Sequence, residues 1–162
     1  VHYPEAFYIA YFSVRADDFD ASIMANGMSV ARQAMSDLLE KKKNGTLTPK
    51  EENLIPILEI CIEMYARGIK FVKVDLYKSH ATDFLETPDG ILPPLNALPD
   101  VGENAAVSIM KEREKAPFKT REELRIRTGV TKTVMEILEK NHCLDKLPEQ
   151  DQVTLFDMFD NE

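Results

Sequence analysis

The sequence contains no tryptophan, only two cysteines and only six glycines among its 162 residues. A disulfide framework needs more cysteines at closer spacing, so Cys61 and Cys143 are expected to be free thiols in a reducing compartment. No apolar run reaches the roughly 18 residues of a membrane-spanning helix, and no signal-peptide pattern is visible. These absences exclude a disulfide-rich secreted domain and favour a cytoplasmic location.

The chain opens on Val1 rather than methionine, in the middle of an apolar pattern, so we expect a piece of a longer protein. Hydrophobic residues make up 44% of it, which is typical of a folded domain rather than a disordered tail. The net charge of −8 argues against a simple nucleic-acid binder. The charge is uneven, however, because residues 111–140 hold nine basic and six acidic residues. Phosphate contacts are therefore expected in or beside this block.

Apolar periodicity predicts helices over most of the first 70 residues. Residues 4–14 begin with proline and are mostly apolar or aromatic, which indicates a buried helix. A second helical stretch begins at Asp17-Asp18, is interrupted at Asn26-Gly27, and resumes over 29–43. Thr48-Pro49-Lys50-Glu51 has the pattern of a capping box and predicts the next helix.

The middle of the chain carries the pattern of a small β element. Lys70–Val74 alternates apolar and polar residues and predicts a strand. Two short apolar pairs, Phe84-Leu85 and Ile91-Leu92, flank Pro88-Asp89-Gly90 and predict a hairpin. Pro93-Pro94 then marks a boundary, after which short helices are predicted over 95–147. The predicted fold class is mainly α with a small β element.

Residues 98–109 carry the most informative turn of the chain. Gly102 permits a tight corner in which Val101 tucks inward, and the helix that follows starts at once. The free N–H groups and positive dipole end of that helix then face outward, an arrangement that holds phosphate without reading a base. An ordinary interhelical turn is the alternative interpretation.

This segment resembles the helix-hairpin-helix motif of DNA-binding proteins through Leu98, Val101, Gly102, Ala106 and Ile109. The resemblance implies that phosphate meets the backbone amides of the hairpin, and that carbonyl oxygens beside it hold a metal cation. Asp100 departs from the pattern, because glycine usually stands there. The implied amide donors are those of Gly102, Asn104 and Ala105, and the implied cation ligands are the carbonyls of Asn96, Leu98 and Val101.

Gly129–Val134 resembles a second, weaker hairpin of this kind, in which Lys132 and Thr133 meet another phosphate. A plain helix connection is the alternative. Seven basic residues lie between the two turns, and we expect two or three of them, Lys111 and Arg113 first, to touch DNA. The seven are Lys111, Arg113, Lys115, Lys119, Arg121, Arg125 and Arg127.

The end of the chain is acidic but carries one apolar cluster. Gln152-Val153-Thr154-Leu155-Phe156 resembles the bacterial sliding-clamp-binding motif Gln-x-x-Leu-Phe. The resemblance implies that Gln152 makes a polar contact at the rim of a pocket, which Leu155 and Phe156 fill. A last helix that folds these residues back onto the core is the alternative.

Taken in order along the chain, these features resemble the C-terminus of DNA polymerase III alpha subunits, and most closely the PolC type of low-GC Gram-positive bacteria. The features are the Pro-Glu-Ala-Phe-Tyr helix, the strand at Gly68-Ile69-Lys70, the 98–109 hairpin, the run Cys143–Pro148 and the tail 152–156. The resemblance implies the end of a fingers domain over 1–66, a helix-hairpin-helix duplex-binding domain over 67–147, and a clamp-binding tail over 148–162.

No catalytic residue is assigned. The polymerase family uses palm-domain aspartates that hold magnesium, and we expect magnesium only in the longer parent, so the segment alone should be inactive. Asp17, Asp18 and Asp20 are read as starting a helix, and the cysteines lack a CxxC partner, so zinc is not expected.

The sequence thus predicts a module that binds the primer-template backbone without sequence preference and tethers the polymerase to the sliding clamp. Its expected partners are duplex DNA, the clamp and the rest of the polymerase chain. Two alternatives remain: a stand-alone helix-hairpin-helix protein of DNA repair or uptake, and an interaction domain that contacts no nucleic acid.

Overall fold

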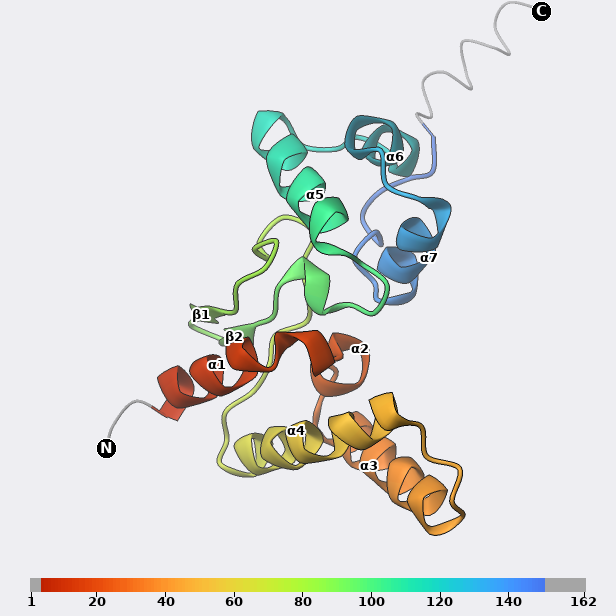
Figure 1. Cartoon of the computed structure of the whole chain (residues 1–162). Helices are drawn as coiled ribbons and strands as arrows, with labels where there is room; N and C mark the ends of the chain where they lie inside the picture. Colours follow the sequence, from red (N-terminus) through yellow and green to blue (C-terminus); the bar gives the residue numbers. More distant parts are fainter. Residues whose placement is uncertain (1–3, 151–162) are drawn as a thin grey trace, which may run out of the picture.

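The structure is a computed structural model that describes residues 4–150 (Figure 1). Over this range the chain forms seven α-helices, two short 3-10 helices and one antiparallel two-stranded sheet, which confirms the predicted fold class. None of the helices in residues 4–150 is both long and apolar enough to cross a membrane.

The chain opens with three short elements: α1 (Pro4–Val14), the 3-10 helix η1 (Ala16–Asp18) and α2 (Ala21–Met24). Asp20 caps α2, since its side chain accepts a hydrogen bond from the Ser22 amide at 2.9 Å. Only one face of α1 is buried, through Tyr8 and Phe12, while Phe7 is 60% exposed. The prediction of a buried helix is therefore confirmed for one face of α1 and wrong for its outer face.

Helices α3 (Met28–Lys43) and α4 (Pro49–Ala66) lie side by side at one end of the molecule (Figure 1). The predicted capping box is present, because Thr48 Oγ1 accepts from the Glu51 amide and Glu51 Oε1 accepts from the Thr48 amide, both at 3.2 Å. Cys61 on α4 is buried, and burial raises the pKa of its thiol to about 12.

Four phenylalanines form the centre of the core. Phe12 and Phe19 from the first 20 residues pack edge-to-face against Phe71, with ring centroids 5.1 and 5.2 Å apart. Phe84 packs against Phe19 at 5.0 Å. The predicted division at residues 66/67 stays a prediction, and aromatic side chains from both sides of it share this cluster.

Strands β1 (Leu85–Thr87) and β2 (Gly90–Leu92) form the predicted hairpin, with Glu86 opposite Ile91. The strand predicted over Lys70–Val74 is wrong in extent, because only Phe71 pairs, in a single parallel bridge to Ile91. The next ladder bond would need a donor at Pro93, which has no N–H. Gly90 is required beside this bridge, since a Cβ there would lie 2.4 Å from the Lys70 carbonyl oxygen.

The second half folds into the 3-10 helix η2 (Leu95–Ala97) and helices α5 (Glu103–Lys115), α6 (Arg121–Thr128) and α7 (Lys132–Lys140). Thr120 and Thr131 cap α6 and α7 by accepting from the amides of Glu123 and Val134. In Figure 1, α5, α6 and α7 gather at the end of the molecule away from α3 and α4.

Two residues past the end of α7, His142 has a φ of 62° where glycine is usual. Its amide donates to the Glu139 carbonyl, and the Cys143 amide donates to the Leu138 carbonyl at 2.9 Å. These two bonds close the helix in the manner of a Schellman motif, with histidine in the left-handed position.

Candidate nucleic-acid interface

The first hairpin connects η2 to α5 and turns at Asp100. Asp100 adopts the left-handed conformation, with a φ of 65°. Val101 follows and is 3% exposed, and Gly102 then opens α5 with φ −72° and ψ 168°. No side chain caps α5 at Gly102. The first amides of the helix therefore have neither an intrahelical acceptor nor a side-chain acceptor at the cap.

The second hairpin connects α6 to α7, and three consecutive residues in it repeat the backbone conformation of the first hairpin. Gly129 has a φ of 70°, Val130 is buried, and Thr131 has φ −73° and ψ 163°. The Thr131 hydroxyl accepts from the Val134 amide. The amides of the first two helical residues, Lys132 and Thr133, have no intrahelical acceptor because they lie in the first turn of the helix. The two turns are thus conformational equivalents.

The equivalence extends to the helices on each side of the turns. Leu95 before the first hairpin and Leu124 before the second are both 0% exposed, as are Ile109 on α5 and Leu138 on α7. Each residue of a pair lies 29 positions from its counterpart in the sequence. The interface is therefore a duplicated unit with two outward-facing helix N-termini.

The predicted phosphate ligands lie at the starts of α5 and α7. Gly102 and Asn104 are exposed at the start of α5, and Ala105 beside them is half-buried. Lys132 and Thr133 are exposed at the start of α7. Whether these residues contact DNA stays a prediction.

The basic residues of the 111–140 block divide into two groups. Arg113 donates to the Leu76 carbonyl at 2.8 Å, and burial lowers the pKa of its guanidinium. Arg121 donates to the Leu147 carbonyl at 2.9 Å, and Arg127 donates to the Ala116 carbonyl at 2.9 Å. The guanidinium groups of these three arginines are bonded to carbonyls of the same chain. The DNA contact assigned to Arg113 therefore stays a prediction. The exposed members of the block are Lys111, Lys115, Lys119, Arg125, Lys132 and Lys140.

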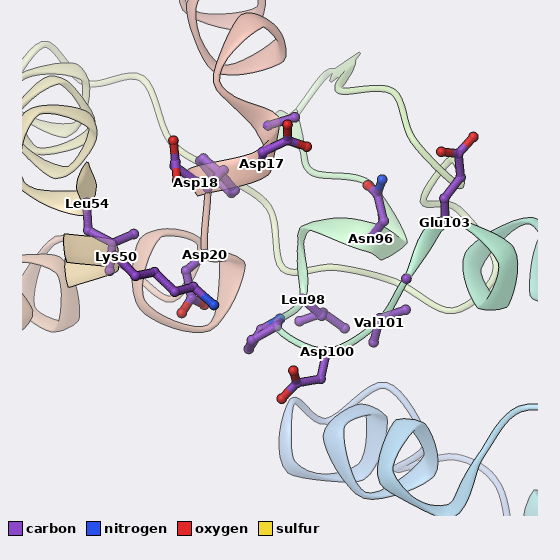
Figure 2. Close-up of a pocket in the computed structure, with 14 residues that line it drawn as sticks. Asp17, Asp18, Asp20, Lys50, Leu54, Asn96, Leu98, Asp100, Val101 and Glu103 are labelled. Atoms are coloured by element: carbon purple, nitrogen blue, oxygen red, sulfur yellow. The ribbon is translucent and has the colours of Figure 1, made fainter. Parts of the chain in front are cut away.

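Carboxylates surround the first hairpin. Asn96 and the segment Leu98–Glu103 line a hollow of about 430 Å³ whose other walls are residues 16–20 and Lys50 and Leu54 of α4 (Figure 2). Figure 2 shows Asp100 and Glu103 on the hairpin side of this hollow. Five acidic residues and one basic residue line it: Asp17, Asp18, Asp20, Asp100, Glu103 and Lys50. The second hairpin carries no acidic residue between Gly129 and Met135.

The cation ligands predicted at the first hairpin are backbone carbonyls. The Leu98 carbonyl already accepts a hydrogen bond from the Val101 amide at 3.2 Å. A carbonyl oxygen has a second lone pair, so this bond is compatible with a cation ligand. Within residues 4–150, no group of three His, Cys, Asp or Glu side chains is placed to hold a metal ion. The carbonyls of Asn96, Leu98 and Val101 stay a prediction.

The sequence indicated a second hairpin at Gly129–Val134, and the structure shows that its backbone matches that of the first. The approach of Asp17, Asp18 and Asp20 to the first hairpin was missed. No local signal could have revealed it, because some 80 residues separate these aspartates from the hairpin in the chain. The predicted clamp ligands Gln152, Leu155 and Phe156 lie outside the described residues.

Comparison with known proteins gives the family. The family model described as "Helix-hairpin-helix motif" matches residues 68–153, which include both hairpins. Three similar relatives are the PolC-type DNA polymerases III of Caldanaerobacter subterraneus subsp. tengcongensis, Clostridium perfringens and Bacillus subtilis, at 51%, 49% and 44% identity.

Each match covers 156 residues, which are 96% of this chain and 11% of the relative. The chain thus spans only a small part of the length of these relatives, and the predicted resemblance to the PolC type is confirmed. The chain belongs to the helix-hairpin-helix family, and its sequence is similar to one segment of the PolC-type DNA polymerases III.

Proposed function

We propose that this segment holds the duplex behind the polymerase by its sugar-phosphate backbone, without preference for sequence. The observation that carries the proposal is the pair of matched hairpins, each of which presents the start of a helix to solvent. Backbone amides and helix dipoles at such positions bind phosphate oxygens and read no base. The lysines exposed beside them add counter-charge. In this role the chain acts in the cytoplasm as one part of the replicative polymerase.

The two hairpins are not equal in charge, and we propose that the second is the stronger phosphate grip. Lys132 and Thr133 add a cation and a hydroxyl donor there, whereas Asp100 and Glu103 add negative charge at the first hairpin. A cation on the carbonyls of Asn96, Leu98 and Val101 would offset that charge. The magnesium ions of nucleotide transfer belong, in this proposal, to other parts of the longer chain.

The tail completes the proposal. Gln152, Leu155 and Phe156 are proposed to dock in a pocket of the sliding clamp, which ties the duplex-holding segment to a ring on the same DNA. When two weak attachments are joined by one chain, binding at one raises the effective concentration of the other. Each attachment can therefore have a modest affinity. Clamp binding rests on the sequence motif alone.

Two rival functions make different predictions. A stand-alone repair or uptake protein would share the hairpins, but the relatives at 44–51% identity are PolC-type polymerases. An interaction domain without nucleic-acid contact is consistent with the charge of −8. Binding of duplex DNA separates that rival from the proposal.

A fluorescence anisotropy titration with unrelated duplexes of equal length tests the proposal directly. We expect similar affinities for all sequences, and an affinity that falls steeply as salt rises, because neutralised phosphates release counterions. Affinity that does not change with salt, or a strong preference for one sequence, would contradict backbone binding.

Substitution of Asp100 tests the charge at the first hairpin. Asn tolerates the left-handed conformation about as well as Asp, so Asp100→Asn removes charge and leaves the turn intact. We expect about fivefold tighter duplex binding, the effect of one charge at short range in water. Asp89→Asn, in the exposed turn between β1 and β2, makes the same change of net charge away from both hairpins and serves as the control. Equal effects of the two variants would show that only the net charge matters.

Removal of the tail tests the clamp contact. A chain without residues 150–162 is expected to lose binding to a bacterial sliding clamp in surface plasmon resonance and to keep its affinity for duplex DNA. The double variant Leu155→Ser with Phe156→Ser provides the matched control, because it keeps the length and charge of the tail. Retention of clamp binding by the truncated chain would remove the tail from the proposal, and retention by the double variant alone would remove Leu155 and Phe156 as its anchors.

A further inference from the structure

Arg127 lies in the last turn of α6, two residues before the left-handed Gly129 of the second hairpin. Its side chain is only 19% exposed and is surrounded by groups from α5 and from the connection between α5 and α6. A guanidinium in this position faces the protein and is largely withdrawn from any ligand in solvent.

The contacts of Arg127 converge on the end of α5. Its guanidinium donates to the carbonyls of Ala116 at 2.9 Å and Pro117 at 3.2 Å, and also to the carbonyl of Glu112. The Glu112 carbonyl also accepts from the Ala116 amide at 3.5 Å, whereas Ala116 and Pro117 lie past the last residue of α5. A helix carries its negative dipole end there, so a cation is stabilising.

Side chains hold the guanidinium from the remaining directions. The carboxylates of Glu112 and Glu123 lie 3.5 and 3.2 Å from it, and its Cζ atom lies over the Phe118 ring, 4.5 Å from the ring centroid. A planar group with several donors and a flat face meets all these partners at once, and a lysine ammonium does not.

A second bond joins the same two elements. Ser108, on the middle of α5, donates through Oγ to the carbonyl of Thr128 at 2.9 Å. Helix α5 begins at the first hairpin, while Arg127 and Thr128 immediately precede the second. Helix α5 therefore carries the first hairpin at its start. The residues that precede the second hairpin are bonded to α5 at Ser108 and at its C-terminal end.

We propose that Arg127 is a positioning residue for duplex binding, which fixes the separation and orientation of the two hairpins so that both engage the same duplex. The proposal rests on the proposed function, and it assigns to Arg127 no contact with DNA. Ser108 supports the same geometry with a single neutral bond.

The physical reason is the effective concentration of the second grip once the first has bound. Rigid contacts of Arg127 keep the second hairpin near its phosphate. Loss of these contacts lowers the effective concentration of the second hairpin but removes neither phosphate-binding hairpin. Loss of Arg127 is thus expected to weaken binding but to leave unchanged the number of phosphates contacted in the complex.

The salt dependence of the affinity measures the number of phosphates contacted, because each phosphate contact contributes close to one unit to the slope of log affinity against log salt concentration. The test compares Arg127→Met with Lys132→Met in the 162-residue chain, by anisotropy with one duplex over a series of salt concentrations. For Arg127→Met we expect binding about tenfold weaker with the slope of the parent. For Lys132→Met we expect weaker binding with a slope smaller by about one.

Two further variants make the role of Arg127 decisive. Arg127→Lys keeps the charge without the planar fork and is expected to bind as weakly as Arg127→Met. Ser108→Ala is expected to weaken binding less than Arg127→Met, again with the parental slope. Combined with Arg127→Met it is expected to add little, because both substitutions remove contacts between α5 and the end of α6. Circular dichroism and thermal melting establish that each variant is folded at the assay temperature. If Arg127→Met is not folded, the slope and affinity of Ser108→Ala decide the question.

Three results would overturn the inference. A slope reduced by about one in Arg127→Met would make Arg127 a phosphate ligand, and parental affinity in a folded Arg127→Met would leave it with a role in folding alone. Full binding by Arg127→Lys would show that charge suffices. Failure of the parent chain to bind any duplex would instead remove the proposed function itself, and the positioning role with it.

Discussion

Each hairpin depends on a residue in the left-handed conformation that is followed by a valine with a buried side chain. The left-handed residue reverses the chain within one position, and the valine anchors the turn to the core, so that the next residue can begin a helix at the surface. The amides at the start of α5 and α7 are exposed for this reason. The proposed grip on phosphate follows from backbone geometry, and it requires no base contact.

The same geometry explains how the two turns tolerate different residues. Gly129 adopts a φ of 70° without strain, whereas Asp100 adopts 65° with the modest penalty that Asp and Asn pay there. The first hairpin therefore keeps its shape but gains a carboxylate beside those of Glu103 and the 16–20 segment. Shape is conserved between the turns while charge is not, which is the basis for ranking them.

Much of the fold could be read from the sequence because its signals are local. Thr48 with Glu51, Thr131 with Val134, and Pro88-Asp89-Gly90 each specify a cap or a turn within a few residues, and all three are present in the structure. The strand at Lys70–Val74 was over-extended because its length depends on a partner strand that Pro93 ends. Glu123 follows Thr120 at the spacing of a capping box, but its side chain accepts from the Lys119 amide at 2.9 Å instead.

The candidate site was harder to read, because a basic residue in a sequence does not show which way it points. Lys132 and Arg113 look alike as positive charges, yet one is exposed at a helix start and the other is tied to the Leu76 carbonyl. Arg127 and Arg121 likewise serve distant carbonyls of the same chain. Such long-range pairings, and the carboxylates of 16–20 beside the first hairpin, exist only once the chain has folded.

The central claim is that main-chain donors at the two matched corners meet the duplex. The most direct measurement is a titration of the ¹⁵N-labelled chain with a short duplex, followed by amide chemical shifts. The account predicts that the largest changes fall on the amides of residues 102–105 and 131–133, at the starts of α5 and α7. Large changes elsewhere, with those amides unmoved, would contradict it.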